Sequence, residues 1–287
     1  MKNDLTTNIG GFFSDTIFVE GAEDWTKDLF GKIHELRVED QDPPSGANTS
    51  VKWYVVERGI AKKAWIQCCQ KEQAAWPYGD TQPDASEVLP KIVTFFSYKG
   101  GMGRTTALTA VALELLRRKK NVLMLDTDLE APGLSTFFFP ADDAGYIRKG
   151  TVDYLQEKSM NPNTPMNMSD YIIPLTSPVY MENGMGNLYL VSGGKLNDEF
   201  LLKLARIDSQ ELVGENLKKN LVQLLKDCCE ALKGSGGIDY ILIDSRAGFH
   251  DMAGVVTAQI PHGIVLFGKD SFQSWFGIQQ AVRTIAT

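Results

Sequence analysis

The feature that most constrains this chain is the stretch 92–106, which reads IVTFFSYKGGMGRTT. Its first five residues are apolar, β-branched or aromatic, which is typical of a buried strand. Three glycines within four positions follow, and the apolar periodicity of 107–116 then predicts a helix. A strand, a glycine-rich turn and a helix in this order let backbone N–H groups and the helix N-terminus converge on one anion. The stretch therefore predicts a phosphate-binding loop.

The loop departs from the usual pattern G-x-x-x-x-G-K-[ST] at two positions. Tyr98 stands in place of the first glycine, and Arg104 stands in place of the lysine. Lys99 adds a second cation near the start of the loop, and Thr105 stands where a Mg²⁺ ligand is needed. The alternative is a glycine-rich turn that binds nothing. The order of three glycines, two cations and two threonines argues against that alternative.

The segment 99–105, Lys-Gly-Gly-Met-Gly-Arg-Thr, resembles the deviant Walker A motif of the ParA/MinD class of P-loop ATPases. More narrowly, it is similar to the KGGVGR variant branch, which has arginine at the last cationic position. The resemblance implies binding of ATP and Mg²⁺ and ATP-dependent dimerisation, in which Lys99 reaches the nucleotide of the second subunit. It implies a set of nucleotide-binding residues in this sequence: Lys99, Gly100, Gly101, Met102, Gly103, Arg104, Thr105 and Thr106.

A second candidate segment begins at Asp244, which ends the apolar run 240–243 as a Walker B aspartate does. A carboxylate at this place can orient a Mg²⁺-bound water while Thr105 ligates the ion directly. The residues that follow, Ser-Arg-Ala-Gly, resemble the Asp-Ser-Arg-Thr-Gly loop of the same variant branch. Gly248 would let this loop shift with the γ-phosphate. A simple loop cap is the alternative for Asp244, and Arg246 is either a phosphate sensor or a salt-bridged loop residue.

Asp126 and Asp128 follow another apolar run, 122–125, and leave the carboxyl end of its strand, where ligands bind in open α/β sheets. In the ParA/MinD class an Asp-x-Asp at this place contributes one residue to the Mg²⁺ shell and one to the attacking water. We assign Asp126 to the metal and Asp128 to the water, and the order of the two stays open. Two solvated turn aspartates are the alternative. The predicted catalytic residues are Lys99, Arg104 and Asp128, and the predicted metal ligands are Thr105, Asp126 and Asp244.

From residue 91 onward, predicted strands and helices alternate, which is typical of a parallel sheet covered on both faces. We predict an α/β P-loop NTPase domain of the SIMIBI type over 89–287, with a mostly parallel sheet and helices on both faces. Residues 171–175 are expected at a sheet edge, because Pro174 cannot donate to a central ladder. The class continues beyond the point where this chain stops, so we expect a fragment of a longer protein, and adenine versus guanine specificity stays open.

Residues 1–88 predict a small α+β appendage of unknown role, with a helix over 25–36 and strands over 51–57 and 64–68. Four aromatic residues of this part form either core or a ligand-binding face, and core is the favoured interpretation. They are Trp53, Tyr54, Trp65 and Trp76.

Composition narrows the class of partner. The net charge of −7 argues against a large nonspecific nucleic-acid surface, and the basic run 117–120 is explained more simply as the cationic end of a helix.

The four cysteines form two adjacent pairs without zinc-ligand spacing, which indicates reduced structural thiols. The chain opens without a signal peptide, and no apolar stretch approaches the ~20 residues of a membrane span. We expect a soluble, cytoplasmic protein.

Two functions from different classes fit these residues. The first is a dimeric switch ATPase that binds and hydrolyses Mg·ATP, slowly, and regulates a partner protein or a C-terminal effector. The second is a nucleotide-sensing module without turnover, within a larger signalling or anti-phage defence protein. Arg104 and the early end of the chain favour the second, because a planar guanidinium does not replace the point charge of lysine between phosphate oxygens. DNA partitioning and bacterial tyrosine-kinase roles are weaker, since the chain is acidic and has no tyrosine-rich tail.

Overall fold

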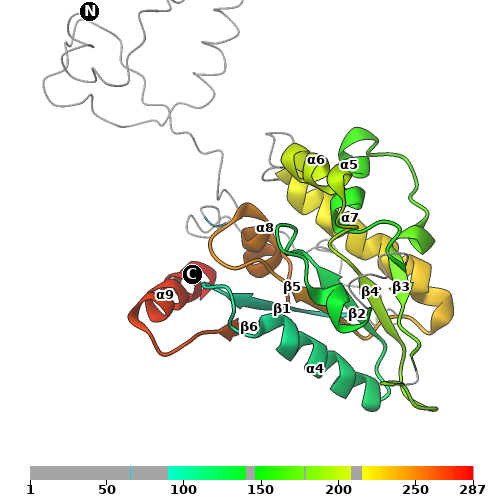
Figure 1. The fold of residues 1–287 in the computed structure, drawn as a ribbon, viewed down its shortest axis with the longest axis horizontal. Coiled ribbons are helices and arrows are strands. Elements are labelled where there is room, and N and C mark those ends of the chain that lie inside the picture. The colour runs from blue at the N-terminus through cyan, green and yellow to red at the C-terminus, as the bar shows by residue number, and fades with distance from the viewer. Residues whose placement is uncertain (1–64, 66–89, 140–145, 178, 208–214, 287) are drawn as a thin grey trace, which may run out of the picture. The chain divides into compact units, whose positions relative to one another are not determined.

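The computed structural model describes residues 65, 90–139, 146–177, 179–207 and 215–286 (Figure 1). The elements predicted for 1–64 and 66–89 lie outside these residues, and so do Trp53, Tyr54 and Trp76.

A six-stranded sheet forms the centre of the domain, with strand order β3-β4-β2-β5-β1-β6. Five strands are parallel, and only β3 runs antiparallel, against β4. The antiparallel strand lies at an edge and ends at Pro174, as predicted from the missing N–H. The strands are β1 (Lys91–Ser97), β2 (Val122–Asp126), β3 (Ile172–Pro174), β4 (Leu188–Val191), β5 (Tyr240–Asp244) and β6 (Gly263–Phe267).

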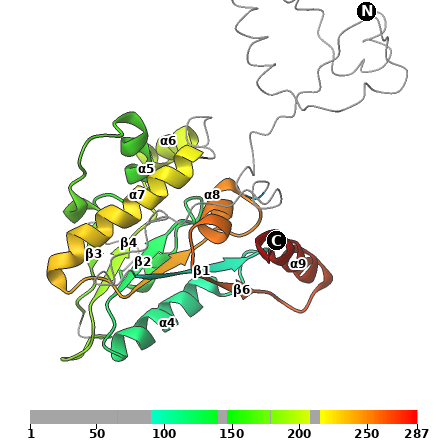
Figure 2. The same ribbon diagram turned by 180° about the vertical axis from the view of Figure 1, so that it is seen from behind.

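Helices cover both faces of this sheet, which confirms the predicted α/β class (Figures 1 and 2). One face carries α4 (Arg104–Arg117), and the other carries α5 (Thr151–Met160), α6 (Asp198–Ile207) and α7 (Glu215–Leu232). Successive side chains of a strand point to opposite faces, so β2 supplies Met124 to the core under α4 and Leu125 to the core under α5 and α7.

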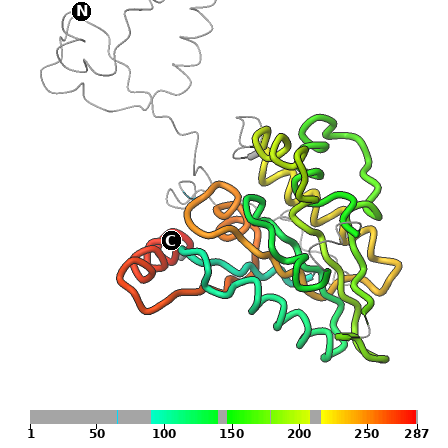
Figure 3. Tube along the Cα trace, viewed as in Figure 1, coloured from blue at the N-terminus to red at the C-terminus, as the bar shows by residue number. Residues whose placement is uncertain are grey.

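A third, smaller core lies at the β1–β6 side of the sheet. After β6 the chain turns back into α9 (Phe272–Ala286), which lies beside these strands (Figure 3). Phe96 of β1 and Ala281 of α9 are both fully buried there. The outer face of α9 leaves Phe272, Trp275 and Phe276 exposed.

The segment between β5 and β6 differs from the sequence analysis, which gave it no helix. It forms the short helix α8 (Asp251–Gly254), which continues as the π-helical turn η7 (Val255–Gln259). Its buried residues, among them Val255 and Val256, fall next to each other rather than at helical spacing, so no amphipathic pattern marks it. The 3₁₀ turn η2 (Leu134–Phe137) after β2 was likewise not predicted.

The basic run 117–120 lies at the C-terminal end of α4, where positive charge is favoured. Arg117 and Arg118 both pair with Glu114, and the Lys120 ammonium lies 3.4 Å from Asp239. These pairs support the capping interpretation over a nucleic-acid patch. Within the described residues, no helix is long and apolar enough to cross a membrane.

Candidate functional site

The phosphate-binding loop predicted from the sequence connects β1 directly to α4. Gly101 and Gly103 have φ angles of 71° and 81°, a left-handed conformation that other residues rarely adopt. Gly103 is the N-cap of α4, and no acidic residue stands in the first turn of this helix. The first N–H groups of a helix lack partners within the helix and carry its positive dipole end. This end of α4 can therefore take an anion, as the sequence predicted.

Arg104, the unusual cation of the loop, is buried and turns inward to the acidic residues. Its Nη1 donates to Ser97 Oγ at 2.7 Å, and its Nη2 donates to Asp128 Oδ2 at 3.1 Å. Its Nε lies 3.6 Å from Asp244 Oδ1. Lys99, the other cation, lies half-exposed at the start of the loop. The two cations that the sequence grouped together therefore face different surroundings.

Thr105 and Asp244 meet, as the motifs predicted. The Thr105 hydroxyl donates to Asp244 Oδ2 at 2.6 Å, and Asp244 Oδ1 is buried without a hydrogen-bond partner. Burial raises the pKa of Asp244, while the Thr105 hydrogen bond and the Arg104 charge act against that rise. A hydroxyl beside a carboxylate with an unsatisfied oxygen is the hard oxygen set that Mg²⁺ takes.

The described part of the chain holds no group of three His, Cys, Asp or Glu side chains that could form a metal site alone. Mg²⁺ is usually held by one or two carboxylates, with phosphates and waters completing its shell. The residues present at Thr105 and Asp244 therefore fit a nucleotide-bound Mg²⁺.

Asp126 lies opposite Asp244 in the β2–β5 register, but its carboxylate is engaged by the backbone. Oδ1 accepts from Asp128 N and Oδ2 accepts from Leu134 N, each at 3.1 Å, and the side chain is fully buried. Burial and the neighbouring Asp244 raise the pKa of Asp126 well above its ordinary value. These contacts give Asp126 a role in holding the loop 127–134, and its predicted metal role stays a prediction.

Asp128 reaches the phosphate-loop cation, which Asp126 does not. Burial raises the pKa of Asp128, and the charges of Arg104 and Arg246 oppose that rise. Of the two aspartates, Asp128 is thus the one whose carboxylate meets a residue of the phosphate loop. The role in positioning the attacking water, predicted for Asp128, stays a prediction.

The second loop, after β5, is tied to the first. Gly248 has a φ of 82°, and its N–H donates to Ser97 O at 3.1 Å. Arg246 forms an ion pair with Glu130, which favours the salt-bridged interpretation of this arginine.

Three residues of the site were not assigned a role from the sequence. Ser97 accepts from Arg104 and donates to Lys99 O at 2.5 Å, and Thr127 Oγ1 donates to Asp244 O at 2.7 Å. The Tyr98 ring lies 5.4 Å from that of Phe249, and a Cβ on Gly277 of α9 would come within 2.0 Å of it. Tyr98, which breaks the usual glycine pattern, thus packs the loop against α9. The tyrosine at a position where the usual pattern has glycine was the sequence signal that could have indicated this contact.

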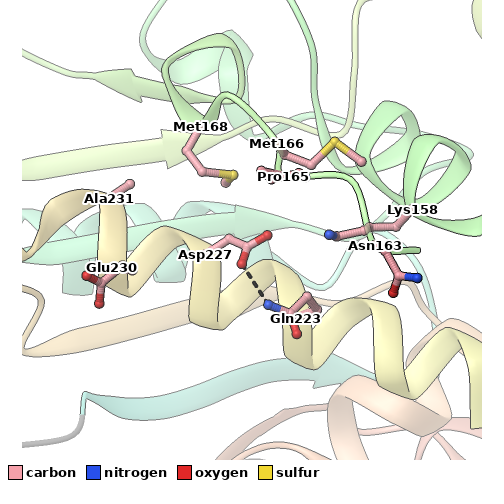
Figure 4. A pocket seen from close by; sticks show the side chains of 9 residues that line it. All are labelled: Lys158, Asn163, Pro165, Met166, Met168, Gln223, Asp227, Glu230 and Ala231. Atoms are coloured by element: carbon pink, nitrogen blue, oxygen red, sulfur yellow. Dashed lines mark hydrogen bonds between the residues drawn. The ribbon is translucent and has the colours of Figure 1, made fainter. Parts of the chain in front are cut away.

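A separate hollow of about 430 Å³ lies between α7 and the segment 158–168 (Figure 4). Three of its polar side chains, those of Lys158, Gln223 and Asp227, have hydrogen-bond partners. Lys158 donates to Pro162 O and Thr164 O, and Asp227 accepts from Tyr154 at 2.6 Å and Gln223 at 2.7 Å. None of the predicted site residues lines it.

Comparisons with known proteins come from sequence and from structure. No protein-family model matches the chain. The cytosolic Fe–S cluster assembly factor CFD1 of Candida albicans is 27% identical over 169 residues, which is 59% of this chain and 50% of the relative. The chain thus spans about half the length of the curated relatives it matches.

Two solved structures are similar at low identity. The ParA structure named pNOB8 ParA is 16% identical, covering 67% of this chain and 55% of its own, with a TM-score of 0.46. The septum site-determining protein MinD of Pyrococcus horikoshii OT3, solved with Mg-ADP, is 21% identical, covering 68% and 65%, with a TM-score of 0.44.

Proposed function

We propose that this chain, which is similar to P-loop ATPases of the ParA/MinD type, is a switch that binds and slowly hydrolyses Mg·ATP. The observation that carries the proposal is the 2.6 Å contact of Thr105 Oγ1 with Asp244 Oδ2 beside the glycine-rich start of α4. This contact would place a pair of Mg²⁺ ligands beside a phosphate site. We also propose that 89–287 is the ATPase domain and that 1–88 is an appendage. We propose that the protein is located in the cytoplasm.

Nucleotide binding rests on the loop backbone and the end of α4. The positive-φ glycines Gly101 and Gly103 shape the loop, and the N–H groups that begin the helix would bind the phosphates. Thr105 and Asp244 would hold Mg²⁺, which when bound neutralises charge on the β- and γ-phosphates. Asp126 contributes by fixing the loop that carries Asp128.

Hydrolysis requires an oriented water and neutralised charge rather than a covalent intermediate. Asp128 would orient the water, and Lys99 would supply charge to the nucleotide of a second subunit. Lys99 is half-exposed, which is compatible with a contact across a dimer. The dimer would in turn expose or release a partner protein or effector as ATP is bound and hydrolysed.

A nucleotide sensor without turnover remains the second candidate, and one observation favours it. The guanidinium of Arg104 occupies Oδ2 of Asp128, the carboxylate to which we assign the water. An aspartate held in a buried ion pair orients water poorly unless the arginine moves to the phosphates when ATP binds.

A single-turnover assay with stoichiometric Mg·ATP separates the two candidates. The switch predicts measurable hydrolysis by the wild type, and a loss of about 10²-fold or more in Asp128→Ala with ATP still bound. The sensor predicts binding by both proteins and the same background turnover in both. The name of the curated relatives refers to Fe–S cluster assembly, a role that we do not propose for this chain; of its described cysteines, Cys228 is buried and Cys229 is partly buried.

A further inference from the structure

Trp65 lies in a socket on the sheet domain although it precedes the predicted domain boundary at 88. Its side chain is 5% exposed and packs in one cluster with Phe96, Ala253 and Ala281. The indole Nε1 donates to His250 O at 3.0 Å. Trp65 falls in the compact unit Ile60–Thr287, so it is buried as core, but against the sheet domain rather than within the predicted appendage.

The wall of the socket belongs to the loop that follows β5. The Phe249 ring meets the Trp65 ring edge-on, with centroids 4.9 Å apart at 89°, and His250 supplies the carbonyl. Such a pair contributes beyond its buried area, and the indole N–H is satisfied. Trp65 therefore fixes the position of 249–250.

The same loop contacts the phosphate-binding loop from its other side. The N–H of Gly248 donates to Ser97 O, and the Phe249 ring lies 5.4 Å from the Tyr98 ring. Three rings, those of Trp65, Phe249 and Tyr98, thus stand in series from the N-terminal segment to the phosphate loop. Packed side chains of this kind transmit displacement because interiors are close-packed.

We propose that Trp65 is a positioning residue whose packing against 249–250 supports nucleotide binding at the phosphate loop. The proposal rests on the proposed function, since it needs a nucleotide at that loop. By thermodynamic linkage, docking of Trp65 and binding of nucleotide then favour each other by the same factor.

The sign of the coupling follows from the contacts. Trp65 holds 249–250 against Tyr98, so its removal leaves the two loops to be ordered by the nucleotide itself. Removing the indole should therefore weaken nucleotide binding.

The test uses the full chain and measures the binding of a fluorescent ATP analogue by the emission of the analogue itself. The variants are Trp65→Ala, Trp65→Phe and the matched control Trp275→Phe, whose indole is 53% exposed on α9. Trp65→Phe keeps a ring in the socket and so guards against a folding failure of Trp65→Ala.

We expect Trp65→Ala to raise the Kd for nucleotide by a factor within the ~5- to 150-fold range of coupled sites. Trp65→Phe should raise it less, and Trp275→Phe should leave it unchanged.

Outcomes that would overturn the inference are distinct from failure of the proposed function. An unchanged or lower Kd in folded Trp65 variants overturns the inference alone. Absence of analogue binding by the wild type overturns both.

Discussion

The guanidinium of Arg104 and the carboxylate of Asp128 form an ion pair in which Nη2 lies 3.1 Å from Oδ2, and the side chains are 8% and 15% exposed. The same guanidinium donates to Ser97 and lies beside Asp244. One buried cation thus joins the end of β1, the loop after β2 and the end of β5. Loss of this guanidinium would leave the carboxylates of Asp128 and Asp244 without their cationic partner in a poorly solvated site.

Substitution of Arg104 should therefore reduce stability as well as alter the nucleotide site. Arg104→Ala should lower the free energy of unfolding by about 3–5 kcal/mol, because a buried ion pair loses one partner. Arg104→Lys should lose less of the free energy of unfolding, since lysine keeps the positive charge but not the planar guanidinium. Urea unfolding at neutral pH measures both. Arg118→Ala, which removes an exposed pair with Glu114, should cost no more than about 1 kcal/mol, and equal losses at the two sites would contradict the account.

Asp126 should make stability fall with rising pH. Its pKa is raised in the folded state, so the folded protein binds this proton more tightly than the unfolded chain. The resulting stabilisation is full below the unfolded pKa near 3.8 and is lost as pH rises through the folded pKa. Asp126→Asn cannot titrate, so any stability advantage of the wild type over it should shrink as the pH rises from near 3.8 towards neutrality. Urea unfolding of both proteins across this range checks the sign, and an advantage that grows with pH would be incompatible with a raised pKa.

Gly277 should tolerate no side chain, because its Cβ would lie 2.0 Å from the Tyr98 ring. Gly277→Ala should cost about 1–3 kcal/mol of stability through overpacking and should also weaken nucleotide binding by displacing Tyr98. Thermal unfolding and analogue binding measure the two effects. Gly234→Ala is the matched control, since a Cβ there meets nothing within 4 Å. If the two alanine variants behave alike, α9 does not support the phosphate loop.

Lys99 should matter for association more than for binding. Lys99→Ala should retain ATP binding, because the loop glycines and the start of α4 remain, but should stay monomeric when ATP is added. Light scattering with and without Mg·ATP measures the change, and Lys195→Ala, another lysine at an exposed position, serves as control. Loss of ATP-dependent association in both variants would point to a general charge effect instead.

Much of the fold could be predicted because its strands are short, apolar runs that end in recognisable turns. The run that ends at Asp244 and the run that ends at Asp126 became neighbouring parallel strands, which brought their carboxyl ends to one edge of the sheet. The meeting of Thr105 with Asp244 follows from that topology and from motif order. The edge position of β3 followed from Pro174 alone.

The remaining features depend on contacts that no spacing encodes. The inward turn of Arg104 depends on Ser97, Asp128 and Asp244, which lie on three different elements. The sequence grouped Asp126 with the metal ligands, whereas both of its oxygens accept backbone N–H groups of the following loop. The burial of Trp65 against Phe249 joins residues 184 positions apart (249 − 65), and α8 buries too few residues to show a period.

The central claim is that the loop after β1 binds Mg·ATP through Thr105 and Asp244, and titration with a fluorescent ATP analogue tests it most directly. The titration is run with and without Mg²⁺ on the wild type and on Thr105→Val, which replaces the hydroxyl by a methyl group of similar size. We predict that the wild type binds, that Mg²⁺ tightens its binding about tenfold or more, and that Thr105→Val binds without this gain. A wild type that binds no nucleotide, or binds it equally well without Mg²⁺, would contradict the account.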